Sequence, residues 1–253
     1  MIKRLFNRND NIAILIAGIF SIIIGLGVAR FAFTGLIPAM LDDYLTIKFV
    51  GILASLNFAG YLSGSIFSIF VKDINFKVYL YRFGIFLAIS TTFILAYSDN
   101  NTLWMVGRVL AGFAGAMCLI VGTSIVMQKL TIKSKTKAMG IHFSGIGFSI
   151  LTTDLLARFV LSLNYTWRDS WAVLAVFAII LSLYSVYILS FDKEVKQNAV
   201  KVKFDISIFT PFVIVLIIAY FTEGVGFVVQ ATFLPDIINN LKGLEGYGSL
   251  TWT

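Results

Sequence analysis

The 253-residue chain has a single cysteine, Cys118, so it can form neither an intrachain disulfide nor a metal site built from cysteines. Charged residues are also scarce. They make up 13% of the sequence, against a share of about 25% in soluble domains. These two shortages exclude a disulfide-stabilised secreted domain and argue against a soluble fold.

Apolar residues take the place of the missing charges: they form 58% of the chain, with 24 Phe and 10 Tyr, and the mean hydropathy is +0.90. A helix needs about 20 apolar residues to cross the hydrocarbon core of a bilayer. Seven stretches of that kind are present, at residues 11–40, 49–71, 78–98, 103–128, 138–163, 171–191 and 206–238. The first stretch is too long for the apolar part of a cleaved secretory signal. The composition therefore predicts an all-α integral membrane protein with seven helices.

The basic residues between these stretches alternate in number from loop to loop. Thirteen lie at the N-terminus and in every second loop: Lys3, Arg4, Arg8, Lys72, Lys77, Lys129, Lys133, Lys135, Lys137, Lys193, Lys196, Lys201 and Lys203. The other loops carry only Lys48, Arg168 and Lys242. Because basic loops remain in the cytoplasm, the N-terminus is predicted to be cytoplasmic. The net charge of +7 thus reflects membrane topology, and we expect a lipid bilayer rather than nucleic acid as the partner.

The longest charged loop, residues 192–205, divides the chain. We predict a six-helix bundle over residues 1–191, a cytoplasmic linker over 192–205, and the first helix of a second bundle over 206–253. A repeated element supports this division: Gly27-Val28 is followed by Pro38, and Gly224-Val225 is followed by Pro235, at the same spacing. Such repetition is typical of transporters built from two halves. The chain is accordingly expected to be a transporter truncated after its seventh helix.

Charged residues within the predicted spans are costly, at about 2.5–3.5 kcal/mol each at the bilayer centre, and they commonly line a solute or proton pathway. Arg82 is close enough to a helix end to reach the membrane surface. The remaining five are predicted to lie in one layer slightly outside the midplane: Arg30, Arg108, Asp154, Arg158 and Glu223.

Two arrangements of these five residues are open. Asp154 and Arg158 are four residues apart on one helix and can form a local pair, with Arg30 and Arg108 held by backbone carbonyls. Alternatively, Arg30 competes for Asp154, and Arg108 and Glu223 line the same cavity. We predict that Arg30 lies within ion-pair reach of Asp154, with Arg108 facing the same cavity.

Glycines in the spans are expected to let neighbouring helix backbones approach closely. The predicted packing positions are Gly25, Gly27, Gly60, Gly64, Gly112, Gly115, Gly145 and Gly147. Gly25 and Gly27 could instead unwind the first helix before Arg30. The single histidine, His142, is expected to be a packed polar residue rather than a proton relay.

Several segments resemble the major facilitator superfamily (MFS). The stretch Arg108-Val-Leu-Ala-Gly112 is similar to its Arg-x-x-x-Gly motif, which is associated with proton coupling in that family. The segments around Gly25–Met40, Asn57–Gly64, His142–Gly147 and Ala231–Pro235 resemble its bacterial YbfB/YjiJ branch. The resemblance implies twelve helices in two halves, alternating access and a small solute. Residues 71–77 depart from the usual cytoplasmic gate motif, and helices 8–12 are absent.

We therefore expect a multi-pass protein of the bacterial cytoplasmic (inner) membrane, without cofactor or enzymatic activity. Its predicted function is proton-coupled secondary transport of a small solute, although the chain alone is expected to move little or nothing. The alternative is a remnant or half-subunit that assembles with a separately encoded second half. A retinal-type pump is disfavoured because the seventh stretch has no lysine for a Schiff base. An intramembrane serine protease is disfavoured because His142 and Ser144 point to different sides of a helix.

Overall fold

The computed structural model describes residues 2–41, 43–131, 135–190 and 209–244, and all regular structure in those ranges is helical. The first and fourth spans are continuous rods made of three pieces each, with a π-helical piece (η) in the middle. The elements are α1 Ile2–Leu5, α2 Asn11–Ile22, η1 Ile23–Phe31, α3 Ala32–Leu41, α4 Ile47–Phe70, α5 Ile74–Tyr97, α6 Asn101–Ala116, η2 Met117–Val121, α7 Gly122–Lys129, α8 Lys135–Ser162, α9 Trp167–Ile188 and α10 Pro211–Asn239.

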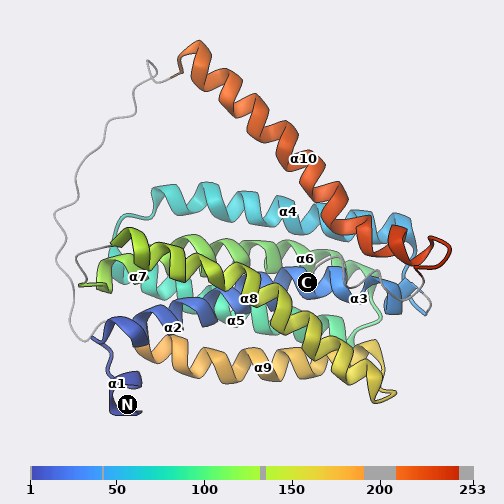
Figure 1. Ribbon diagram of the computed structural model, residues 1–253, viewed down its shortest axis with the longest axis horizontal. Helices are drawn as coiled ribbons and strands as arrows, with labels where there is room; N and C mark the ends of the chain where they lie inside the picture. The colour runs from blue at the N-terminus through green and yellow to red at the C-terminus, as the bar shows by residue number, and fades with distance from the viewer. Residues whose placement is uncertain (1, 42, 132–134, 191–208, 245–253) are drawn as a thin grey trace.

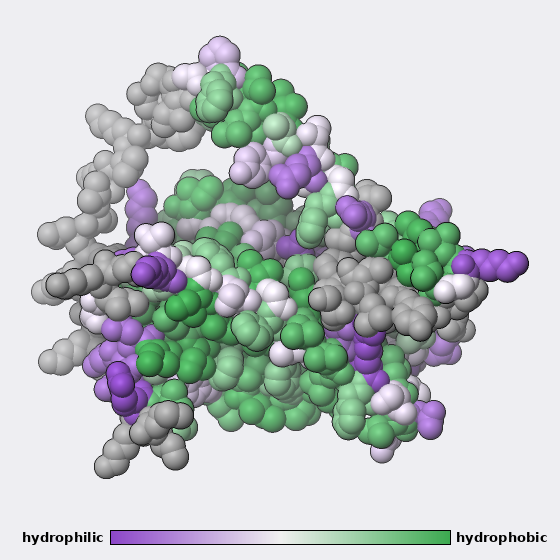
Figure 2. All heavy atoms as spheres, in the orientation of Figure 1, coloured by the Kyte–Doolittle hydropathy of each residue, from purple (hydrophilic) through white to green (hydrophobic). Residues whose placement is uncertain are grey.

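Six helical rods of the described chain are long and apolar enough to span a membrane: 11–41, 47–70, 74–97, 101–129, 135–162 and 167–188. The prediction of an all-α membrane protein is therefore confirmed, and α10 forms a seventh helix. Figure 2 shows hydrophobic residues over the middle of the bundle, with most hydrophilic residues toward its two ends. This distribution suits a protein surrounded by lipid.

Polar residues in the connecting loops fix where the spans begin. Asp10, Thr46, Asp73, Asn100 and Thr166 each accept a hydrogen bond from a main-chain N–H in the first turn of the following helix. These side chains satisfy donors that a helix start leaves unpaired. Because each cap stands directly before an apolar run, the chain turns back at each of these membrane edges.

The helices run alternately up and down, so that the N-terminus and the α4–α5 and α7–α8 connections lie at one end of the bundle (Figure 1). Lysines at this end bind across elements: Lys77 Nζ donates to Ser124 Oγ at 2.8 Å, and Lys129 Nζ donates to the Ser190 carbonyl at 2.6 Å. The loops of this end carry the basic excess of the sequence. The predicted linker, residues 192–205, and Lys133 lie outside the described residues.

The opposite end carries aromatic residues. The ring of Tyr44 lies 5.0 Å from that of Trp104 and 5.9 Å from that of Trp167, centroid to centroid. Trp167 also donates a hydrogen bond from Nε1 to Asp43 Oδ2 at 2.9 Å, and Arg168 pairs with Asp99. Trp and Tyr commonly mark the membrane–water interface. Few cations and several aromatics therefore distinguish this end from the lysine-rich one.

Close helix approaches occur at most of the predicted glycines. A Cβ at Gly60 would collide with the Val109 carbonyl, and one at Gly112 with the Asn57 carbonyl, so α4 and α6 touch backbone to backbone. Gly64, Gly115 and Gly145 are likewise close to neighbouring helices. The expectation for Gly147 is wrong: a Cβ there would meet no described atom within 4 Å. Gly147 lies two residues, or about 200° of helix, from Gly145, and so it faces outward.

The seventh helix, α10, lies apart from the six-helix bundle. Figure 1 shows it diverging from α4 toward its N-terminal end and approaching the bundle toward its C-terminal end, where Phe233 packs on the core. Nearly all of its described side chains up to Phe227 are exposed, including Phe212, Tyr220 and Phe221. Between α10 and α4 this divergence leaves a space that the bundle itself does not fill.

Candidate functional site

The π-helical piece η1 occupies the middle of the first span and ends at Phe31, directly after Arg30. A Cβ at Gly25 would collide with Cys118, and one at Gly27 would lie 2.9 Å from the Ser149 carbonyl oxygen. The glycines thus allow η1 to pack tightly between the fourth and fifth spans. Because a π-helical turn holds an extra residue, it changes the direction of the side chains that follow, and such turns are frequent at functional sites.

Arg30 points toward α4 and lies among aromatic rings. Its guanidinium carbon is 4.3 Å from the centroid of Phe58 and 5.0 Å from that of Tyr61. A cation over an aromatic face is stabilised by the ring quadrupole. This stabilisation is about 0.5–1 kcal/mol at an exposed site and larger where the cation is removed from water. Within the described part of the chain, Arg30 has no acidic partner and no hydrogen-bond acceptor. Its side chain is only partly buried.

Arg108 lies behind Arg30 and is 2% exposed. Its Nη1 donates to the Ala29 carbonyl oxygen at 3.0 Å, and its guanidinium carbon is 4.3 Å from the Phe33 ring centroid. The carbonyl of Arg108 accepts a hydrogen bond from Asn57 Nδ2 at 3.1 Å. Arg108 therefore ties together α6, η1 and α4, and it places a second positive charge beside Arg30.

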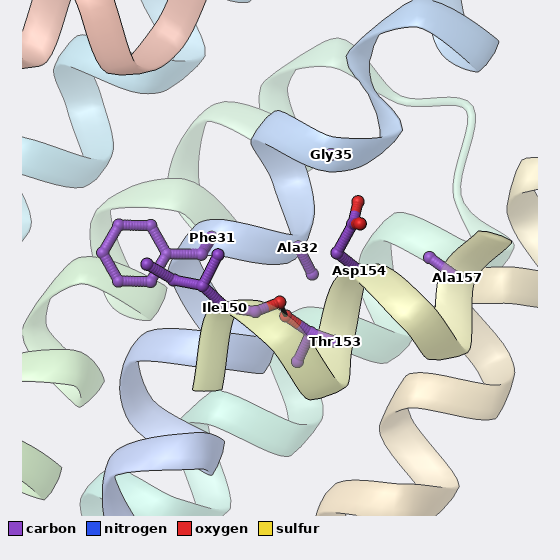
Figure 3. Close-up of a pocket in the computed structure, with 7 residues that line it drawn as sticks. All are labelled: Phe31, Ala32, Gly35, Ile150, Thr153, Asp154 and Ala157. Atoms are coloured by element: carbon purple, nitrogen blue, oxygen red, sulfur yellow. Dashed lines mark hydrogen bonds between the residues drawn. The ribbon is translucent and has the colours of Figure 1, made fainter. Parts of the chain in front are cut away.

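Asp154 pairs with Arg158 on its own helix, with 2.6 Å between Oδ2 and Nε. The carboxylate points from α8 toward α3 at Gly35, where a Cβ would lie 3.2 Å from Oδ1 (Figure 3). The cavity there is about 10 Å³, about enough for one water molecule. The predicted ion pair between Arg30 and Asp154 is wrong. The two residues lie at a similar depth in the membrane. Their side chains point in different directions, however: Arg30 points from the first span toward α4, whereas Asp154 points from α8 toward the first span.

Glu223 is exposed on α10. Neither Glu223 nor Arg108 lines the cavity that Arg30 borders, contrary to the expectation of one shared cavity. Because α10 stands apart from the bundle, this carboxylate is separated from the core charges. Arg82, on α5, is exposed as well. The five predicted residues therefore fall into three groups: Arg30 with Arg108, Asp154 with Arg158, and Glu223 by itself.

A cavity of about 670 Å³ lies between α4 and α10, beside Arg30. Its lining residues are Arg30, Ser55, Phe58, Tyr61, Leu62, Ser65, Tyr220, Phe221, Gly224, Val225 and Phe227. The volume is in the range of small-molecule sites, which combine apolar walls with a few polar groups. Phe58 and Tyr61 were not among the site residues expected from the sequence. Their i, i+3 spacing, which puts both rings on one face of α4, was the available signal.

His142 is buried in the bundle, 1% exposed, and its Nε2 lies 2.9 Å from Thr123 Oγ1. It stands beside Gly18 of α2, where a Cβ would come within 2.6 Å of Nδ1. The residue thus fills a polar position in helix packing. Among the described residues, no group of three or more His, Cys, Asp or Glu side chains could hold a metal ion.

Comparison with known proteins places the chain in a family. Residues 22–253 match the family described as "Uncharacterised MFS-type transporter YbfB". The chain is also similar to a "Protein TsgA homolog" of Buchnera aphidicola subsp. Baizongia pistaciae (strain Bp), with 23% identity over 161 residues. That alignment covers 62% of this chain and 41% of the relative, so the chain matches less than half of the relative's length. The family match and the six membrane-length helices agree with the resemblance found in the sequence: the chain belongs to the YbfB-type MFS transporters, which are membrane transporters rather than enzymes.

Proposed function

We propose that the chain provides the first six-helix bundle, and the first helix of a second bundle, of a secondary transporter in the bacterial cytoplasmic membrane. Residues 1–191 form the first bundle in this proposal, 192–205 the cytoplasmic linker, and 206–253 the start of the second bundle. The transporter moves a small solute by alternating access, in which two bundles rock about a site between them. Family membership supports the reaction class. The lysine-rich end of the bundle supports a cytoplasmic N-terminus.

The observation that carries the proposal is the position of Arg30. It stands near the middle of the first span, about 28 Å from the start of the span at Asn11 and about 17 Å from its end at Leu41, at a rise of about 1.5 Å per residue. At that depth a cation facing lipid is strongly disfavoured. Instead Arg30 lines the cavity of about 670 Å³ between α4 and α10. A charged group that borders a cavity at the membrane midplane is suited to bind a solute.

Proton coupling is the second part of the proposal, and Glu223 is its candidate carrier. Its side chain is exposed on α10, the helix that belongs to the second bundle in this proposal, and no described residue pairs with it. A carboxylate between two moving bundles can exchange a proton with alternating sides of the membrane. Asp154 is less suited to this role because Arg158 holds it as a local ion pair.

The alternative is a half-subunit that assembles with a separately encoded second half, and the exposed surface of α10 fits it equally well. The α10 helix is exposed along most of its length, with Phe212 at 75% and Val215 at 65%. Exposed apolar surface of this size is usually covered by other helices or by lipid. Further helices would cover it whether they belong to the same polypeptide or to a partner chain.

Electrical recording from proteoliposomes adsorbed on a solid support tests the proposal. A panel of small organic anions, zwitterions and cations is applied to the protein as it is encoded, with a pH gradient across the liposome membrane. We expect little or no current from residues 1–253 alone. With the second half present we expect a current with at least one class of solute, and its loss in Glu223→Gln when the pH gradient is the only driving force. Arg82→Gln, at the membrane edge, is the matched control. A solute current that is independent of pH and equal in Glu223→Gln would contradict proton coupling.

A complementary measurement separates the two assemblies. If the transporter is made of two chains, co-expression with the separately encoded half restores the current that the isolated chain lacks. If the chain carries a current by itself, the half-subunit alternative is excluded.

A further inference from the structure

The aromatic rings around Arg30 leave one part of its guanidinium free. The guanidinium carbon lies over the rings of Phe58 and Tyr61, 4.3 and 5.0 Å from their centroids, and 5.6 Å from the centroid of Phe31. Rings that stack on a guanidinium cover its flat faces, whereas its N–H donors point outward in the plane of the group. No described residue accepts from these donors. Arg30 therefore presents an unoccupied planar set of donors at the wall of the cavity.

The charges around this cavity are not balanced. Arg108 stands behind Arg30 and is held by the Ala29 carbonyl, which is neutral. Asp154 pairs with Arg158, and Glu223 forms no ion pair with a described residue. Arg30 thus lines the cavity with Arg108 buried behind it, and neither guanidinium has an acidic partner among the described residues. In a low-dielectric environment this arrangement attracts an anion.

The remaining lining indicates what kind of anion fits. Leu62, Tyr220, Phe221, Val225 and Phe227 provide apolar and aromatic surface. The Ser65 hydroxyl is already used, because it donates to the Tyr61 carbonyl at 2.8 Å. Only a few polar groups face the cavity, so a strongly hydrated, polyhydroxylated solute would lose more hydrogen bonds than it gains.

We propose that Arg30, oriented by Phe58 and Tyr61, binds the carboxylate of an amphiphilic organic anion whose aromatic or apolar body fills the cavity between α4 and α10. This proposal rests on the transporter function, and it names the class of solute. A carboxylate matches the planar donors of arginine in a two-pronged hydrogen bond, which lysine cannot reproduce. Phe58 and Tyr61 act as positioning residues, because they hold the guanidinium plane toward the cavity.

Binding to the purified protein in nanodiscs of zwitterionic lipid tests this inference without any need for transport. The probe is 2-naphthoate, and its neutral isostere 2-naphthamide is the matched ligand control. We expect the wild-type protein to bind the carboxylate at least ten-fold more tightly than the amide. Arg30→Lys should lose about ten-fold in affinity for 2-naphthoate, and Phe58→Leu several-fold, whereas Arg82→Lys should bind like the wild type.

Equal affinities of the wild-type protein for carboxylate and amide would overturn the proposal, and so would unchanged binding in Arg30→Lys. If Arg30→Lys fails to fold, the carboxylate–amide comparison on the wild type decides by itself. Displacement of 2-naphthoate by anionic phosphatidylglycerol in the nanodisc would mean that the site holds a lipid headgroup, which also contradicts the proposal. Binding of 2-naphthoate without any solute current would leave this inference standing and contradict the transporter function. A current carried only by cations would leave the transporter function standing and contradict this inference.

Discussion

The guanidinium of Arg108 donates a hydrogen bond from Nη1 to the main-chain carbonyl oxygen of Ala29, 3.0 Å away. Through this bond the fourth span holds the π-helical piece of the first span at the residue that precedes Arg30. The arginine of the Arg-x-x-x-Gly motif thus supports the backbone that positions a second arginine. This buried guanidinium contacts a carbonyl and the face of Phe33, and no acid among the described residues.

Arg108→Lys should destabilise the bundle by about 1.5–3 kcal/mol, the typical value of a hydrogen bond that involves a charged group. Lysine keeps the charge but cannot both reach the Ala29 carbonyl and lie flat over Phe33. The free energy of unfolding in mixed micelles, measured by denaturant titration, checks this expectation. Arg82→Lys is the control, because Arg82 is exposed and should change stability by less than about 0.5 kcal/mol. Equal stabilities of the two variants would contradict the anchoring role.

Gly60→Ala should destabilise the protein by about 1–3 kcal/mol, because the added methyl group meets the Val109 carbonyl at the crossing of α4 and α6. Gly147→Ala offers a matched substitution in α8, where a Cβ has no described neighbour within 4 Å. There alanine should be neutral or stabilise by up to about 1 kcal/mol through its higher helix propensity. Thermal unfolding of the two variants in detergent compares them directly. A neutral Gly60→Ala would show that the two helices do not approach as closely as described.

The Asp10 carboxylate predicts a pH dependence at the N-terminal end. The main-chain N–H of Ile12, and then Arg4, hold the pKa of this carboxyl below its ordinary value of 3.8. A lowered pKa in the folded state means that the ionised cap stabilises above the ordinary pKa, and that this stabilisation is lost as pH falls through the lowered one. Asp10→Asn should therefore flatten the decline of the unfolding midpoint between pH 5 and pH 2, at about the same midpoint near pH 7. If the unfolding midpoint of Asp10→Asn declined between pH 5 and pH 2 as steeply as that of the wild type, a contribution of the Asp10 cap would be excluded.

The orientation of the chain can be tested by single-cysteine labelling. Cys118 is the only cysteine and is fully buried, so Cys118→Ala provides a background without reactive thiols. Lys135→Cys, at the start of α8, should react with a membrane-impermeant maleimide only after the inner side is opened. Asn240→Cys, just after α10, should react from outside in intact cells. Labelling of both positions from the same side would exclude the proposed topology.

The sequence was sufficient for the spans and their alternation, because the length of apolar runs and the placement of lysines follow from simple costs in the bilayer. The i, i+4 spacing of Asp154 and Arg158 likewise indicated that they can form an ion pair. Estimated depth could not show which direction a side chain takes around its helix, and for that reason the pair of Arg30 and Asp154 was wrong. Gly25 and Gly27 had indicated a possible unwinding of the first helix, but not the π-helical turn that changes the direction of Arg30.

The aromatic surroundings of Arg30 illustrate the same limit. Phe58 and Tyr61 lie in the next span, and only the close α4–α6 crossing at Gly60 and Gly112 fixes where they face. Contacts of this kind depend on the packing of three helices at once. The sequence therefore predicted which charges lie within the spans, but the structure was needed to sort them into groups.

The accessibility of position 30 tests the central claim most directly, namely that Arg30 borders a solute cavity at the middle of the membrane. Arg30→Cys in the Cys118→Ala background is treated with the small, charged thiol reagent MTSES, and compared with Ile180→Cys, which faces outward from the middle of α9 at 61% exposure. The account predicts that position 30 reacts, because a hydrophilic reagent can enter the cavity, and that position 180 does not, because lipid covers it. An unreactive position 30, indistinguishable from position 180, would contradict the account.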